Sequence, residues 1–101
     1  KRRWKALHTF RRPYFTELEV LDKIFFAALR EPRERQRVRE LAFQEEDTFK
    51  LIRGLVRADN RSFVVDVGAS FGLFSLFALE CGAQRVVAVE PNQLQCSLLN
   101  A

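Results

Sequence analysis

Phe63-Val64-Val65-Asp66-Val67-Gly68-Ala69-Ser70-Phe71-Gly72 has the pattern of a strand followed by a tight turn. Phe63 to Val67 is rich in β-branched residues without polar alternation, which predicts a strand buried on both faces of a parallel sheet. Gly68 and Gly72 permit backbone angles and close approaches that a Cβ would block. The apolar residues 73–81 predict a helix whose first N–H groups point into the turn. The stretch therefore predicts a small-molecule cradle at the carboxyl end of a parallel strand.

A second apolar strand is predicted over Arg85 to Val89, followed by Glu90-Pro91-Asn92. Strand, helix and strand form a βαβ unit, whose right-handed crossover places the two strands side by side. Glu90 then projects next to the glycine turn, 22 positions after Gly68. An acidic residue about 20 positions after a glycine turn is the expected acceptor for the ribose hydroxyls of a nucleoside cofactor. Residues 93–101 are predicted to begin the next helix, with Asn92 as its N-cap.

The spacing of the glycines discriminates between nucleoside cofactors. A dinucleotide fingerprint requires Gly-x-Gly-x-x-Gly, but counting from Gly68 the next two glycine positions hold Ser70 and Leu73. The missing glycines disfavour a nicotinamide-dependent oxidoreductase. The pattern is instead Asp-x-Gly-x-Ser-x-Gly, which runs from Asp66 to Gly72 and has its acid inside the end of the strand.

This pattern, together with the later Val87-Ala88-Val89-Glu90-Pro91-Asn92, resembles the cofactor motifs of class I S-adenosylmethionine-dependent methyltransferases. It is most similar to the FkbM family, which commonly shows Asp-x-Gly-Ala-Asn-x-Gly and then a Glu-Pro pair. Ser70 stands where that family usually has Asn. The resemblance covers Val64 to Ala101 and concerns the cofactor half of the family fold.

The resemblance implies S-adenosylmethionine as the cofactor and methyl transfer as the reaction, most often to an oxygen of a small-molecule or sugar acceptor. It implies that Asp66 organises the turn and reaches toward the methionine end of the cofactor, whereas Glu90 binds the ribose. Substrate-side residues of the family follow a later strand, so no general base and no particular methyl acceptor is assigned. The implied cofactor-binding residues are Asp66, Gly68, Ala69, Ser70, Phe71, Gly72, Glu90, Pro91 and Asn92.

The predicted fold class is α/β, the N-terminal part of a Rossmann-like class I methyltransferase fold. Residues 1–60 are expected to form a helical N-terminal extension, and residues 61–101 the beginning of the cofactor-binding domain. Because the family sheet has more strands than this length accommodates, we expect the chain to be a fragment of a larger domain. A sheet cut after two strands would leave apolar faces and unpaired edges exposed.

Helical patterns dominate the predicted extension. A capping box of Thr16 and Glu19 opens the first predicted helix, over residues 16–30, with apolar residues at helical spacing. Residues 33–43 are compatible with a helix or with a short strand, and their four alternating arginines are interpreted as a solvated face beside neighbouring glutamates. Residues 45–58 predict another helix, whose acidic start complements the helix dipole.

The first twelve residues hold six basic residues and no acid, with Trp4 and Phe10 interleaved. This composition is typical of an arm that binds phosphates, either of a nucleic acid or of an anionic membrane surface, and also of a transit segment. The alternative without a binding function is that these residues are a solvated segment leading into the first predicted helix. A nucleic-acid-binding module, or an RNA methyltransferase that uses the arm, is therefore the alternative function. Salt dependence separates it from a small-molecule enzyme.

Several classes of protein are disfavoured. No apolar stretch approaches the roughly 18 residues of a membrane-spanning helix. Cys81 and Cys96 form no Cys-x-x-Cys pair, so we expect free buried thiols in a reducing compartment, which fits the cytoplasm. His8 is the only histidine, and zinc, P-loop and nucleophile-elbow patterns are missing, so neither a metal site nor a catalytic triad is assigned. The oligomeric state is left unassigned.

Overall fold

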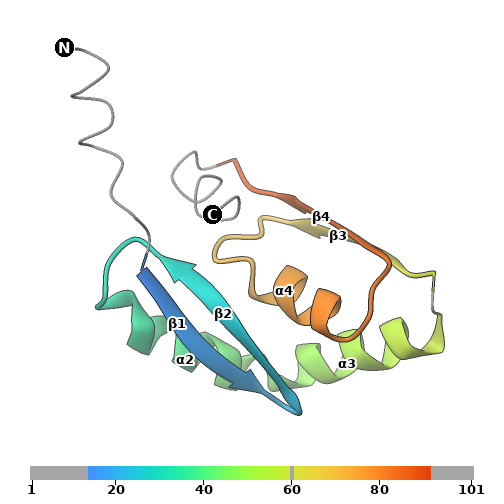
Figure 1. Cartoon of the computed structure of the whole chain (residues 1–101), viewed down its shortest axis with the longest axis horizontal. Helices are drawn as coiled ribbons and strands as arrows, with labels where there is room; N and C mark the ends of the chain where they lie inside the picture. Colours follow the sequence, from blue (N-terminus) through green and yellow to red (C-terminus); the bar gives the residue numbers. More distant parts are fainter. Residues whose placement is uncertain (1–13, 60, 92–101) are drawn as a thin grey trace.

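The computed structural model of the 101-residue chain describes residues 14–59 and 61–91 (Figure 1). The basic arm, Asn92, Cys96 and the helix predicted over residues 93–101 lie outside the described residues. In chain order, the elements of the described residues are β1 (Tyr14–Val20), β2 (Lys23–Leu29), α2 (Glu34–Gln44), α3 (Glu46–Ala58), β3 (Phe63–Val67), α4 (Leu73–Glu80) and β4 (Arg85–Val89). One sheet pairs β1 with β2, and the other pairs β3 with β4.

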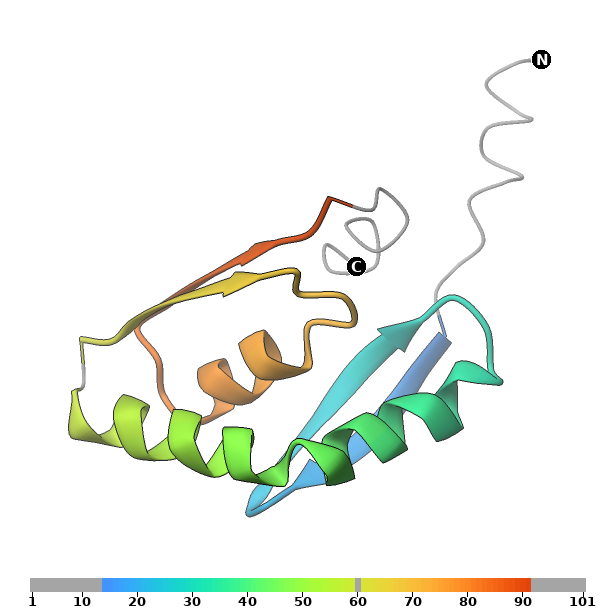
Figure 2. The same ribbon diagram turned by 180° about the vertical axis from the view of Figure 1, so that it is seen from behind.

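The predicted βαβ unit is confirmed. β3 and β4 are parallel neighbours, in register from Phe63 opposite Arg85 to Val67 opposite Val89. α4 connects them and packs on one face of the pair, as Figure 2 shows from behind. The two strands therefore end side by side, which places the glycine turn after Val67 next to Glu90.

The predicted burial of β3 on both faces is wrong. Val64 and Asp66 are half-buried, whereas Phe63, Val65 and Val67 are exposed on the face away from α4. On this outer face the Arg85 guanidinium lies over the Phe63 ring, 5.5 Å from its centroid. The reason is that α4 covers one side of the pair, and no described element forms a second layer on the other.

The helix predicted over residues 16–30 is also wrong, because this segment forms the antiparallel hairpin β1–β2. Alternate residues Thr16, Leu18 and Val20 are buried while Glu17 and Glu19 are exposed, which is the period of a strand with one dry face. The supposed capping box of Thr16 and Glu19 thus lies within β1, and its two side chains point to opposite faces.

The hairpin connection is tied to α3. Leu21 adopts a positive φ of 54° in the two-residue connection, and Asp22 beside it accepts from two arginines of α3. The Arg53 Nη1–Asp22 Oδ1 distance is 3.2 Å and the Arg57 Nη2–Asp22 Oδ2 distance is 3.1 Å. Desolvation alone would raise the pKa of Asp22, but its backbone N–H, Arg53 and the nearby cations outweigh this effect and lower the pKa.

Along the chain, two helices, α2 and α3, follow the hairpin and precede β3. Residues 34–44 form α2, which decides the ambiguous segment in favour of a helix. Its first residue, Glu34, is buried and accepts from the Arg30 and Glu31 N–H groups at 2.8 and 3.1 Å, which ties the end of the hairpin to the helix. α3 confirms the helix predicted over residues 45–58 to within one residue. Leu55 of this helix is 63% exposed.

The core is centred on α4, which contacts β2, α3, β3 and β4. Phe77 of α4 and Phe49 of α3 are fully buried, and their rings meet edge to face with centroids 5.0 Å apart. Phe74 adds a second ring 5.0 Å from that of Phe49. The main cluster consists of Leu18, Val20, Phe25, Ala27, Leu29, Val38, Phe49, Phe71, Leu73 and Phe77. Among the residues that the structure describes, no helix is long and apolar enough to cross a membrane.

Replacing Phe77 with alanine should lower the free energy of unfolding by about 3–5 kcal/mol, because a fully buried ring leaves a cavity. Phe43→Ala is the matched control, since this ring is 79% exposed and its loss should change stability by less than about 0.5 kcal/mol. Denaturant unfolding followed by circular dichroism measures both. Equal effects of the two substitutions would contradict the packing described here.

Candidate functional site

The turn between β3 and α4 has three residues in the left-handed region. The φ angles of Gly68, Ser70 and Gly72 are 71°, 53° and 76°. The Gly68 and Ala69 N–H groups both donate to the Val89 carbonyl, at 2.7 and 3.1 Å. The two predicted glycines therefore meet a real conformational requirement, and their turn is fastened to the end of β4.

Glu90 lies beside this turn, as predicted. Its Oε1 accepts a hydrogen bond from the Ser70 N–H at 2.8 Å, and the residue is half-buried. Glu90 and the turn lie side by side because the strands are parallel and in register. Val67 and Val89, the last residues of β3 and β4, are opposite each other, so the residues that follow both strands leave the sheet at the same edge. A ribose contact by Glu90 stays a prediction.

Asp66 is held by a residue that sequence reasoning missed. The Ser75 hydroxyl donates to Asp66 Oδ2 at 2.8 Å, and Ser75 is buried in the first turn of α4. A serine within an otherwise apolar helix was the available signal. Because the strand carries Asp66 and the helix carries Ser75, this bond joins the two elements that flank the turn.

The remaining predicted site residues divide into two groups. Ala69 and Phe71 are buried, and the Phe71 side chain belongs to the main core cluster. Phe71 therefore anchors the turn to the core. It also borders the pocket described below. Pro91 is exposed directly after Glu90, and Asn92 lies outside the described residues.

A pocket of about 320 Å³ lies on the turn. One wall is the end of β3, the turn and the first residues of α4. The other wall comes from the α2–α3 region. Its lining residues are Arg37, Leu41, Glu45, Phe49, Asp66, Val67, Gly68, Ala69, Ser70, Phe71, Leu73 and Phe74.

The arginines of α2 and its lead-in were interpreted together as a solvated face, and the structure separates them. Arg33 is exposed and pairs with Glu31, with 2.7 Å between Nε and Oε2, and Arg35 is exposed on α2. Arg37 borders the pocket on the turn, and Arg39 borders a different groove. All four arginines are exposed, as the interpretation expected, but it did not foresee that Arg37 and Arg39 border pockets.

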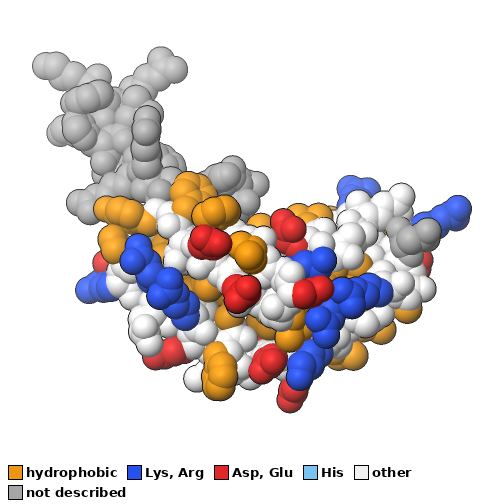
Figure 3. Space-filling view, turned by 60° about the horizontal axis from the view of Figure 1, so that its bottom comes forward, with side chains coloured by type: hydrophobic (Ala, Val, Ile, Leu, Met, Phe, Trp, Pro, Cys, Tyr) orange, Lys and Arg blue, Asp and Glu red, His pale blue; other side chains and the backbone are white. Residues whose placement is uncertain are grey.

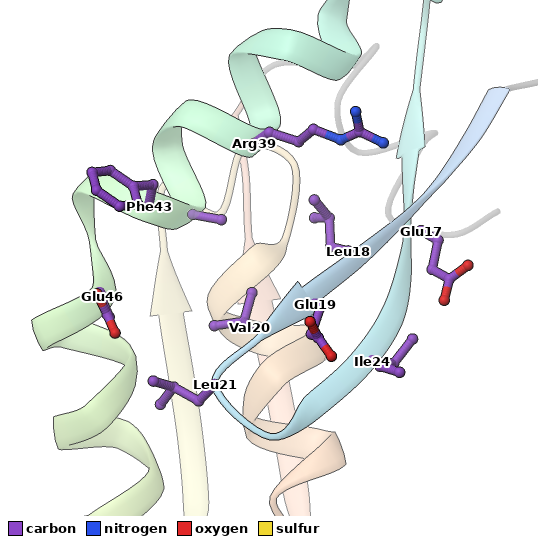
Figure 4. Close-up of a pocket in the computed structure, with 10 residues that line it drawn as sticks. Glu17, Leu18, Glu19, Val20, Leu21, Ile24, Arg39, Phe43 and Glu46 are labelled. Atoms are coloured by element: carbon purple, nitrogen blue, oxygen red, sulfur yellow. The ribbon is translucent and has the colours of Figure 1, made fainter.

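That second groove is larger, about 730 Å³, and lies between α2 and β1. Figure 4 shows Arg39 extending from α2 over the hairpin, with Phe43 farther along the helix. None of the turn residues lines this groove, and Glu90 does not line it either. The smaller pocket is the better candidate site, because it combines the glycine turn, a buttressed carboxylate and a cation at the carboxyl end of a parallel strand.

Ser70 offers a test of the turn geometry. Replacing Ser70 with valine should destabilise the protein by about 1–3 kcal/mol, because a β-branched side chain resists the left-handed region. Ser70→Asn should be neutral or slightly stabilising, because Asn adopts that region more readily. Both variants keep the backbone N–H of residue 70, which donates a hydrogen bond to Glu90. Thermal unfolding of the two variants measures the difference. If valine and asparagine proved equally stable, residue 70 would not be in the left-handed conformation.

Three further observations bear on identity. Within residues 14–59 and 61–91, no group of three or more His, Cys, Asp and Glu side chains is arranged to hold a metal ion. Cys81 is a half-buried free thiol at the end of α4, and its burial raises the thiol pKa more than the nearby cations lower it.

A scan against protein-family models, a search of curated proteins and a search of solved structures found no match to this chain. Function is therefore inferred from the chemistry of the turn, the pocket and Glu90.

Proposed function

We propose that this chain forms the cofactor-binding half of an S-adenosylmethionine-dependent methyltransferase of the FkbM type, acting on an oxygen of a small-molecule or sugar acceptor. The observation that supports this most is the Glu90 carboxylate held 2.8 Å from the Ser70 N–H of the glycine turn. Both groups lie at the carboxyl ends of adjacent parallel strands, where open α/β sheets bind ligands. A nucleoside cofactor uses this pairing of a turn with an acid.

Gly68 supports a close approach of a ligand to the backbone. A Cβ built at Gly68 would meet no atom of the described residues within 4 Å, although Gly68 lines the pocket. Packing among these residues therefore does not require a glycine here, whereas the positive φ does favour one. The open space above this Cα is where a cofactor would contact the turn.

Glu90 has the chemistry that a ribose requires. The two ribose hydroxyls are vicinal donors, and a carboxylate accepts from both at once. The bond from Ser70 fixes the direction of the carboxylate relative to the turn. On binding, the ribose would share or replace the contacts that Glu90 makes within the protein, which couples the acid and the turn to the same ligand.

Asp66 is oriented for a different part of the ligand. Ser75 fixes one oxygen of this half-buried carboxylate, and the residue lines the pocket next to Gly68. A carboxylate in this position favours a cationic group, as expected for the methionine end of the cofactor. The bound cofactor supplies a methyl group activated on sulfonium, so the main task of these residues is to position it.

The nucleic-acid alternative depends on the basic arm alone. Six of the 17 Lys and Arg residues lie in the first twelve positions, so the remaining 11 face all 13 Asp and Glu residues. Over the face in Figure 3, basic side chains lie beside acidic ones and do not form one basic surface. Phosphate-driven binding would weaken steeply with ionic strength, and binding of a small cofactor would not.

Replacing Glu90 with alanine in the full-length protein should weaken the binding of S-adenosylhomocysteine by about 2–4 kcal/mol, or roughly 30- to 1000-fold. The loss arises because two ribose hydroxyls would lose a charged acceptor. Glu90→Gln should lose less, since the amide oxygen still accepts. Isothermal calorimetry gives the affinities, and circular dichroism verifies the fold.

Glu80→Ala is the matched control, because Glu80 is an exposed acid at the far end of α4. This variant should bind like the wild type. An affinity of Glu90→Ala within twofold of the wild type, with an intact circular dichroism spectrum, would show that Glu90 is an ordinary surface acid and would overturn the proposed function.

A further inference from the structure

We propose that Arg37 of α2 binds the α-carboxylate at the amino-acid end of the cofactor, and so makes the region before the βαβ unit part of the binding site. This inference rests on the proposed function. Side chains of opposite charge line the pocket on the turn. Arg37 lines it from α2, and Asp66 lines it from β3.

The position of Arg37 follows from helix periodicity. Arg37, Leu41 and Glu45 are four residues apart, so they lie one above another on the same face of α2 and its end. These three residues are the contribution of that face to the pocket. Val38, next to Arg37, is fully buried in the core cluster, which fixes the rotation of the helix. Because the burial of Val38 fixes how α2 is rotated, it also determines that Arg37 lies on the side of the helix that borders the turn.

Arg37 differs in its contacts from the four arginines that form ion pairs within the described residues, although it shares the lack of an ion pair with its neighbours Arg35 and Arg39. The four ion pairs are those of Arg30 with Glu34, Arg33 with Glu31, and Arg53 and Arg57 with Asp22. Arg37 makes no ion pair with any carboxylate in the described part of the chain. Its guanidinium is therefore available to an external anion, and a planar guanidinium matches a carboxylate with two parallel hydrogen bonds.

The charge pattern fits a zwitterion. An amino-acid end carries a carboxylate and an ammonium group on one carbon. The pocket offers the Arg37 guanidinium for the first, and the Asp66 carboxylate, with Glu45 as a second carboxylate of the lining, for the second. At about 320 Å³ the pocket is at the small end of ligand sites. Glu90 is not among its lining residues. We infer that the amino-acid end occupies this pocket while the nucleoside lies across the turn, toward Glu90.

The test compares three probes that share the nucleoside, using the full-length protein. S-adenosylhomocysteine has both charged groups, its decarboxylated analogue keeps the ammonium group alone, and 5′-methylthioadenosine lacks the amino-acid end. Calorimetry measures each affinity for the wild type, Arg37→Ala, Arg37→Lys and the control Arg35→Ala. Arg35 is also an exposed arginine of α2, but it does not line the pocket.

Arg37→Ala should weaken S-adenosylhomocysteine about 10- to 100-fold, as expected for loss of charged hydrogen bonds. It should change the other two probes by less than threefold, because neither carries the carboxylate. Arg37→Lys should recover part of the loss, and Arg35→Ala should bind like the wild type. The wild type alone should prefer S-adenosylhomocysteine to its decarboxylated analogue, a comparison that does not depend on whether a variant folds.

Failure of this inference is distinct from failure of the proposed function. If the wild type bound S-adenosylhomocysteine but Arg37→Ala bound it equally well, the carboxylate site would be wrong and the proposed function would stand. Equal weakening of all three probes by Arg37→Ala would indicate a structural role and would also overturn the inference. A wild type that bound none of the probes would overturn both.

Discussion

The structure depends on the burial of α4, an eight-residue helix that is apolar on almost every side. A helix that crosses between two parallel strands covers one face of their sheet, but its remaining faces would then meet water. Here α3 and β2 cover them, and the ring of Phe49 against Phe77 is the central contact of that covering layer. β2 of the hairpin and α3 thus cover most of the apolar surface of α4 that the sheet leaves open.

This constraint also builds the site. The glycine turn leads directly into α4, and buried Phe71 and Leu73 anchor it on either side of Gly72. A turn held in this way keeps the Ser70 N–H aimed at Glu90 without help from a ligand. Because the covering layer packs against the same end of α4, it contributes the second wall of the pocket. The elements that bury the helix therefore also determine which charges face the turn.

The sequence predicted the βαβ unit because its local and tertiary signals agree, with β-branched strands joined through glycines that adopt positive φ. It failed for the hairpin, since Leu18, Leu21 and Phe25 also fit helical spacing. Only the packing of alternate residues against the core distinguishes the two patterns. Within the site, Glu90 was predictable from its distance along the chain. Arg37 was not, because its place depends on how one face of α2 packs against a turn about 30 residues later.

The proposed function requires the turn and Glu90 together to accept a methionine nucleoside and not a dinucleotide. Isothermal calorimetry of the full-length protein with S-adenosylhomocysteine, and separately with NAD, tests this requirement. We expect binding of S-adenosylhomocysteine that changes little between low and high salt, and no measurable binding of NAD. Tight binding of NAD without any response to S-adenosylhomocysteine or S-adenosylmethionine would contradict the proposed function.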